Sequence, residues 1–161
     1  MGMGHGAWGS FTGIPGIFQK NRAGLAKRDI KRLQSLQNKV LRLVDYKDIY
    51  TPTRELLKTT KQLSVNQLIA FHIGKQTYKI QKSEKPDYHF ERLFDKNFQP
   101  TRTRPDNIKR IDFRLNSGQS SFFCQASRLW SAIPFDISNT NRGVFKSKLK
   151  EWIWDNIPIK P

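Results

Sequence analysis

Residues 26–44, AKRDIKRLQSLQNKVLRLV, carry the strongest helical pattern in the chain. Apolar side chains return along this segment at steps of three and four residues, which is the spacing of one helix face. These positions are Ala26, Ile30, Leu33, Leu36, Val40 and the pair Leu43 and Val44. The pattern predicts an amphipathic helix of about five turns. We therefore expect Leu33 and Val40 to be buried, and Lys31 and Arg42 to be exposed.

The remaining surface of this predicted helix is basic. It carries Lys27, Arg28, Lys31, Arg32, Lys39 and Arg42. Over the whole chain 29 Lys and Arg stand against 13 Asp and Glu, for a net charge of +16 and a pI of about 10.3. An excess of this size is typical of proteins that bind polyanions, although a solvated basic face with no ligand is the alternative. The six side chains are candidate contacts for nucleic-acid phosphates.

Arg102 and Arg104 form a second candidate site for nucleic acid. They stand among prolines, after an aromatic cluster that consists of Tyr88, Phe90, Phe94 and Phe98. Guanidinium planes stack on unpaired bases, so this segment is predicted to favour single strands. An ordinary exposed loop is the alternative interpretation of both arginines.

Two further helices are predicted before residue 83. Ser64-Val65-Asn66-Gln67 has the pattern of a capping box, with Leu63 and Leu68 placed to form a hydrophobic staple, and it predicts a helix to about Gln81. Pro52 follows Thr51 as the first helical residue follows an N-cap, which predicts a short helix through Leu57.

The C-terminal third is predicted to fold back on itself. Partial alternation between Ile108 and Leu115 indicates one short strand, and helices are expected at 126–133 and at 141–156. The first of these helices stops at a proline, which allows the second to return along it. We expect one contact cluster formed by Trp130, Pro134, Phe145 and Leu149.

These patterns predict a mainly α fold, a small helical domain with one short β element and a flexible glycine-rich N-terminus. The chain of 161 residues divides into a poorly ordered lead-in (1–24), a basic helical segment (25–83), a proline- and aromatic-rich linker (84–106) and a strand-plus-helix segment (107–157). A chain of this length holds about one domain.

The sequence contains no pattern of a catalytic or metal site. The three histidines lack metal-ligand spacing, and the single Cys124 cannot form a cysteine cluster. No Asp-Asp pair is present for polymerase chemistry, and no nuclease or nucleotide-binding motif is complete. We expect a protein that is not an enzyme and that needs no cofactor and no metal. One cysteine fits an intracellular location, nucleus or cytoplasm, and no apolar run is long enough for a membrane span.

Several ordered segments resemble one family. Residues 33–44, LQSLQNKVLRLV, resemble the "LQNKALRII" helix that follows the thumb in LINE-type (non-LTR) retrotransposon reverse transcriptases. Residues 8–10, 63–79 and 101–102 resemble that family's "VWG", "L-x-V/L-x-x-L…K-x-x-Y-K" and "N-T-R" elements. Residues 127–134 and 145–150 resemble its terminal "LWN-x-LP…FK-x-x-LK", with Ser131 in place of the usual Asn. Order and approximate spacing agree over roughly residues 7–154.

The resemblance is to the C-terminal region of such proteins, beyond the polymerase domain. It implies a family that handles RNA and target DNA, while the endonuclease and the Tyr-x-Asp-Asp polymerase site belong to parts that precede the matching region. The leading hypothesis is therefore a non-catalytic fragment that binds RNA or DNA electrostatically, without sequence preference. The alternative is a protein-interaction module that packs on a reverse transcriptase body or self-associates.

Overall fold

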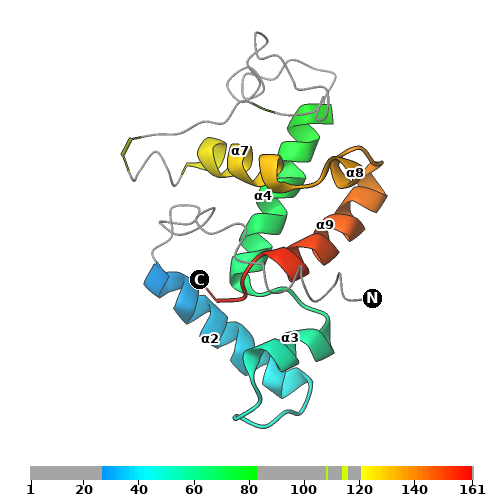
Figure 1. The fold of residues 1–161 in the computed structure, drawn as a ribbon. Helices are drawn as coiled ribbons and strands as arrows, with labels where there is room; N and C mark the ends of the chain where they lie inside the picture. The colour runs from blue at the N-terminus through cyan, green and yellow to red at the C-terminus, as the bar shows by residue number, and fades with distance from the viewer. Residues whose placement is uncertain (1–26, 83–107, 109–113, 116–120, 161) are drawn as a thin grey trace, which may run out of the picture.

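The computed structural model describes residues 27–82, 108, 114–115 and 121–160, which form a mainly helical domain (Figure 1). In chain order its helices are α2 (Lys27–Val44), α3 (Thr53–Thr60), α4 (Val65–Lys82), α7 (Phe122–Ala132), α8 (Phe135–Ser138) and α9 (Arg142–Asn156). The prediction of a mainly α fold is confirmed. No strand occurs among the described residues.

Some predictions fall on other parts of the chain. The lead-in at 1–24, the linker at 84–106 and most of the predicted strand lie outside the described residues, as do Arg102 and Arg104. Of the strand segment, only Ile108, Arg114 and Leu115 are described, and none of the three is in a strand. The short β element stays a prediction.

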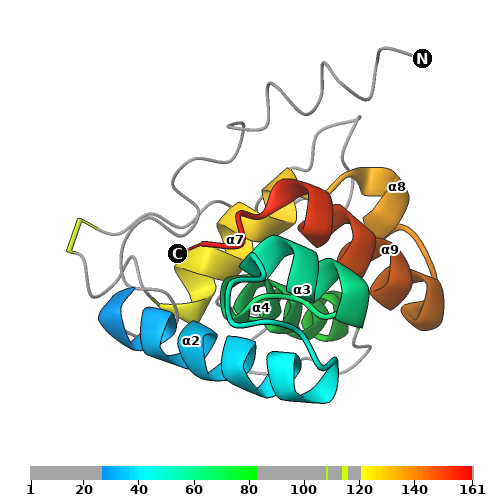
Figure 2. The ribbon, with the colours of Figure 1, turned by 90° about the horizontal axis from the view of Figure 1, so that it is seen from below.

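Helix α4 is the central element. Helices α7 and α9 cross α4 and pack against it, whereas α2 and α3 lie near the end where it begins (Figures 1 and 2). One hydrophobic core joins α4, α7 and α9. Its fully buried large side chains include Trp130, Leu129, Phe145, Leu149 and Ile153. Helix α4, which begins at the predicted capping box, therefore contacts α2, α7 and α9.

Aromatic contacts hold the C-terminal helices against α4. The ring of Tyr78 stacks on that of Phe145 with centroids 4.1 Å apart, and the Trp130 ring lies 6.1 Å from the same phenyl group. Three members of the predicted cluster, Trp130, Phe145 and Leu149, thus belong to one core. The fourth predicted member, Pro134, is exposed and is not part of this core, so its inclusion was wrong. It is the N-cap of α8, and its carbonyl accepts the first hydrogen bonds of that helix.

A glycine permits the close approach of α9 to α4. A Cβ atom built on Gly74 would lie 2.9 Å from Cδ2 of Leu149, a separation that side chains essentially never adopt. Leu149 is fully buried in the core. The absent side chain at position 74 therefore fixes how closely these two helices pack.

The predicted capping box is present at the start of α4. Ser64 Oγ accepts from the Gln67 backbone N–H at 3.2 Å, and Gln67 Oε1 accepts from the Ser64 N–H at 3.1 Å. The same glutamine donates through Nε2 to the Ile157 carbonyl at 2.9 Å, while Asn66 donates to the Pro158 carbonyl at 2.7 Å. One local motif thus starts α4 and also ties the segment after α9 to it.

Three local predictions need correction. Pro52 is the N-cap of α3 rather than its first helical residue, since its carbonyl accepts from the Leu56 N–H. Helix α7 begins at Phe122, four residues before the predicted start, because Ser121 caps it by accepting from the Cys124 N–H. The apolar pattern of residues 141–156 predicts that Val144 lies on the same face as Phe145 and Leu149, but Val144 is exposed.

Candidate interaction surfaces

Helix α2 turns polar side chains toward the rest of the domain. Gln34 Oε1 accepts from the Val65 backbone N–H at 2.9 Å, and Gln37 Nε2 donates to the Leu63 carbonyl at 2.8 Å. Gln34 also donates to Gln37 Oε1 at 2.8 Å. These amides satisfy backbone groups at the entrance of α4, so the inward face of α2 is held by hydrogen bonds.

Gln34 and Gln37 belong to a polar row on the inward face of α2, which continues with Asn38 and Arg42 toward α3. Asn38 Nδ2 donates to Thr53 Oγ1 at 2.8 Å, and Arg42 Nη2 donates to the Thr51 carbonyl at 3.1 Å. Arg42, predicted to be exposed, is therefore half-buried and holds the loop before α3. It is the one predicted phosphate contact on α2 that has a structural role of this kind.

Because the inward side is polar, the apolar side of α2 faces solvent. Leu33, Leu36, Val40 and Leu43, which we call the outer face of α2, are exposed by 43, 57, 57 and 77%. The prediction that Leu33 and Val40 are buried is wrong. On this helix, Ile30 is the buried residue.

The outer face has the spacing of a helix-packing seam. Its four residues are separated by three, four and three positions, which places them at a and d of two heptads. The residues that immediately precede Leu33 and Val40, at the g positions, are Arg32 and Lys39. The turn after α2 adds exposed Tyr46, Ile49 and Tyr50. Exposed apolar groups gathered in this way are typical of interaction sites.

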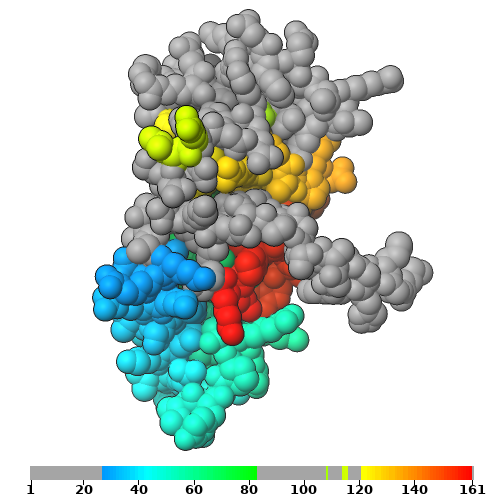
Figure 3. All heavy atoms as spheres, turned by 60° about the vertical axis from the view of Figure 1, so that its left-hand side comes forward, coloured from blue at the N-terminus to red at the C-terminus, as the bar shows by residue number. Residues whose placement is uncertain are grey.

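The predicted basic residues of α2 lie at the molecular surface. Lys27, Arg28, Lys31, Arg32 and Lys39 are all exposed, and α2 forms the blue edge of the molecule in Figure 3. Of these five, Arg28 has an acidic neighbour, Asp29, at 4.0 Å. The surface of α2 therefore combines an apolar seam with a row of cations beside it.

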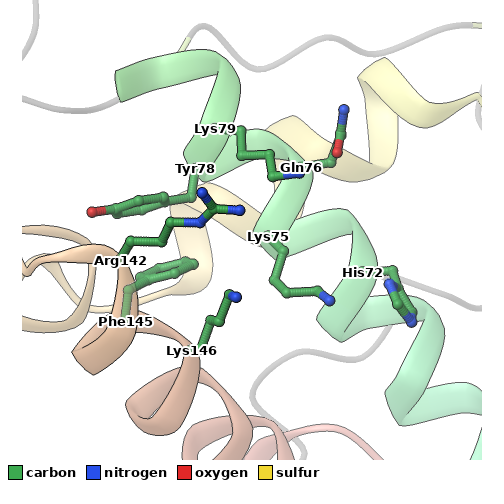
Figure 4. A pocket seen from close by; sticks show the side chains of 8 residues that line it. All are labelled: His72, Lys75, Gln76, Tyr78, Lys79, Arg142, Phe145 and Lys146. Carbon is green, nitrogen blue, oxygen red and sulfur yellow. The ribbon is translucent and has the colours of Figure 1, made fainter. Parts of the chain in front are cut away.

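A basic crevice of about 160 Å³ lies between α4 and α9. Its lining residues are His72, Lys75, Gln76, Tyr78 and Lys79 of α4 and Arg142, Phe145 and Lys146 of α9 (Figure 4). Sequence reasoning missed this site. The available signal was two pairs of cations at a spacing of four residues, 75 with 79 and 142 with 146, in segments that lack a nearby acid.

A larger and more apolar groove of about 410 Å³ lies between α3 and α9. Leu57, Leu63 and Trp154 line it, with Lys61, Lys150 and Asp155 among its polar groups. Asp155 is exposed, and partial desolvation in the groove raises the pKa of its carboxyl above the ordinary value of 3.8, while the Glu151 carboxylate raises that pKa further. The contribution of this carboxyl to the free energy of unfolding is therefore fully present below pH 3.8, and it is lost as the pH rises through the raised pKa.

The part of the chain that the structure describes holds no cluster of three potential metal ligands. Cys124 is buried in α7, and His72, which sits between two core residues in sequence, is exposed. No helix within the described ranges has the length and hydropathy of a membrane span.

Comparison with family models, with curated proteins and with solved structures finds no match to this chain. The resemblance to reverse transcriptase tails therefore rests on the sequence segments quoted above.

Proposed function

We propose that this chain is a non-catalytic docking module, and that the outer face of α2 packs on a helix of a partner protein. The observation that carries the proposal is the orientation of α2, whose polar row faces the domain while its leucines face solvent. Because hydrogen bonds on the inward face fix the orientation of α2, its outer face stays exposed and can contact a partner helix. Helix-on-helix recognition uses anchors at this spacing.

The cations beside the outer face of α2 favour a partner helix that is acidic. Arg32 and Lys39 flank the seam at g positions, where charged residues determine which helix is accepted. A partner helix with carboxylates beside an apolar stripe would pair with them. A second copy of this chain is disfavoured, because its net charge of +16 opposes association and antiparallel pairing would set Arg32 against Lys39.

The family resemblance suggests which protein carries the partner helix. Residues 33–44 resemble the helix that follows the thumb of a LINE-type reverse transcriptase, so the surface that α2 meets would belong to the polymerase body. On this proposal the chain has no catalytic role and positions or stabilises a larger nucleic-acid enzyme.

A synthetic acidic helix tests the proposal. The probe is a heptad peptide with Leu at a and d and Glu at e and g, and its control carries Lys at e and g. We expect the protein to bind the acidic peptide, and to bind the Lys peptide at least about tenfold more weakly because like charges then face each other. Fluorescence anisotropy of labelled peptides measures both affinities.

Matched variants locate the contact. Leu36→Gln with Leu43→Gln should abolish binding of the acidic peptide, whereas Val144→Gln, an exposed apolar residue on α9, should leave it unchanged. Equal binding by both variants would contradict the proposal. Sedimentation of the protein alone supplies a second check, since a stable dimer lost in the Leu36/Leu43 variant would make the occupant a second copy.

Nucleic-acid binding is the second candidate function, and the row of exposed cations on α2 favours it. Point charges along one helix neutralise phosphates without reading bases, so binding should weaken steeply with salt. In a Lys31/Arg32/Lys39 triple alanine variant, the slope of log affinity against log salt should fall by about 0.9 for each lost duplex contact. Identical slopes for the variant and the wild type would show that α2 contacts no phosphate.

A further inference from the structure

We infer that the crevice between α4 and α9 binds a phosphate group of a nucleic-acid backbone. This site is separate from the docking surface proposed above. Helix α2 hydrogen-bonds to the residues around the start of α4, whereas the crevice lies along the later turns of α4 and the first turns of α9. Either surface can therefore fail its test without affecting the other.

Four cations line the crevice from two helices, and one of them, the Lys75 ammonium, lies over the Phe71 ring at 4.8 Å from its centroid. Lys75 and Lys79 are one turn apart on α4, and Arg142 and Lys146 are one turn apart on α9, so that all four side chains border the same hollow (Figure 4). None of the four takes part in a salt bridge with any residue that the structure describes. Like charges held together without a carboxylate repel one another, and a bound anion relieves that repulsion.

The donor set suits phosphate. Arg142 presents a planar fork that matches two phosphate oxygens, while the lysines supply compact charges that adapt to the remaining oxygens. Arg142 and Lys146 also stand in the first turns of a helix of 15 residues, where the helix dipole adds positive potential. A crevice of about 160 Å³ has room for one phosphate group.

The floor of the crevice excludes base recognition. Tyr78 and Phe145 line it, but their rings are stacked on each other at 4.1 Å and are almost fully buried. The Tyr78 hydroxyl donates to the Thr140 carbonyl at 2.6 Å, which fixes the ring in place. With no free aromatic face available, the contact is predicted to be independent of sequence.

The position of the cations favours a polymer over a free ion. Lys79, Arg142 and Lys146 are exposed at the rim of the crevice. A phosphodiester can therefore enter with its chain continuing on either side, as in the phosphate contacts that position nucleic acids on proteins.

An oligothymidylate of about 12 nucleotides is the probe. The test variant is K79Q/R142Q/K146Q, and the matched control R54Q/K58Q/K148Q removes three exposed charges elsewhere, including one on α9 itself. We expect the test variant to bind the strand at least about fivefold more weakly than the control. The slope of log affinity against log salt should fall by about 0.7 relative to the control, the value for one phosphate on a single strand. Equal affinities and slopes would overturn the inference.

A titration with inorganic phosphate distinguishes the two possible ligands, a free phosphate ion and a phosphate of a nucleic-acid backbone. Titration should shift the backbone amide resonances of Gly143 and Val144 in the wild type and not in the test variant. If these shifts occur but the test and control variants bind oligothymidylate equally, the ligand is a free anion. That result would overturn the assignment to a nucleic-acid backbone. Circular dichroism checks that each variant is folded, and the single variant K146E, which reverses one exposed charge, should lower strand affinity in the same direction.

Discussion

The Trp130→Ala variant is expected to lose about 3–5 kcal/mol of its free energy of unfolding. Trp130 is fully buried in α7, and its ring lies 6.1 Å from that of Phe145 at the junction of α4, α7 and α9. Removing the indole leaves a cavity that rigid helices on three sides cannot close. Since small domains have total stabilities of about 5–15 kcal/mol, this loss is a large part of the whole. Urea denaturation followed by circular dichroism measures it.

Trp152→Ala is the matched control, because Trp152 is half-buried at the edge of the same core. Its replacement should cost clearly less than that of Trp130. Equal midpoints for the wild type and the Trp130 variant would place this indole outside the core and contradict the packing described above.

The Gln67→Leu variant is expected to lose about 2–4 kcal/mol, although the two side chains are similar in size. Gln67 is fully buried, accepts from the Ser64 N–H and donates to the Ile157 carbonyl. Leucine would leave both backbone groups buried without their partner, and each such group costs about 1–3 kcal/mol. Ser64→Ala removes only the serine oxygen that receives the Gln67 N–H, so it should cost about 1 kcal/mol.

Thermal or urea denaturation of both variants tests this prediction. A Gln67→Leu protein no less stable than Ser64→Ala would mean that the hydrogen bond to Ile157 contributes nothing. In that case the capping box alone would account for the role of Gln67.

Helix positions in this chain follow from local signals. The capping box at Ser64 depends on four adjacent residues, so the start of α4 was predictable without knowledge of the fold. Residues 26–44 likewise predicted α2 closely, because a period of three and four residues is a property of the helix itself. The early start of α7 was missed because residues 117–121, SGQSS, have the composition of a turn, whereas Ser121 is the N-cap of the helix.

The orientation of α2 did not follow from its own pattern. Hydrophobic periodicity identifies the apolar face, but it predicts burial only if the rest of the domain presents an apolar surface to that face. Here the entrance of α4 presents the Val65 N–H and the Leu63 carbonyl instead, and Gln34 and Gln37 satisfy them. The polar side chains Gln34 and Gln37 have helical spacing too, and the narrow a and d stripe at Leu33 and Leu36 is typical of a coiled-coil seam rather than of a helix buried in a domain core.

The basic crevice was missed for a different reason. Its cations come from two segments more than 60 residues apart, and a spacing of four residues within each segment is equally typical of a solvated helix face. Only the packing of α9 on α4, through Gly74 and Leu149, brings Lys75 and Lys79 close to Arg142. No local pattern contains that information.

The most direct test of the outward orientation of α2 is the stability of a variant with Leu36, Val40 and Leu43 all changed to Gln. These side chains are more than half exposed, so the free energy of unfolding should change by less than about 1 kcal/mol. Urea denaturation, with the wild type in parallel, gives this value. A loss of about 3 kcal/mol or more would show that the three residues are buried in the core and would contradict the account.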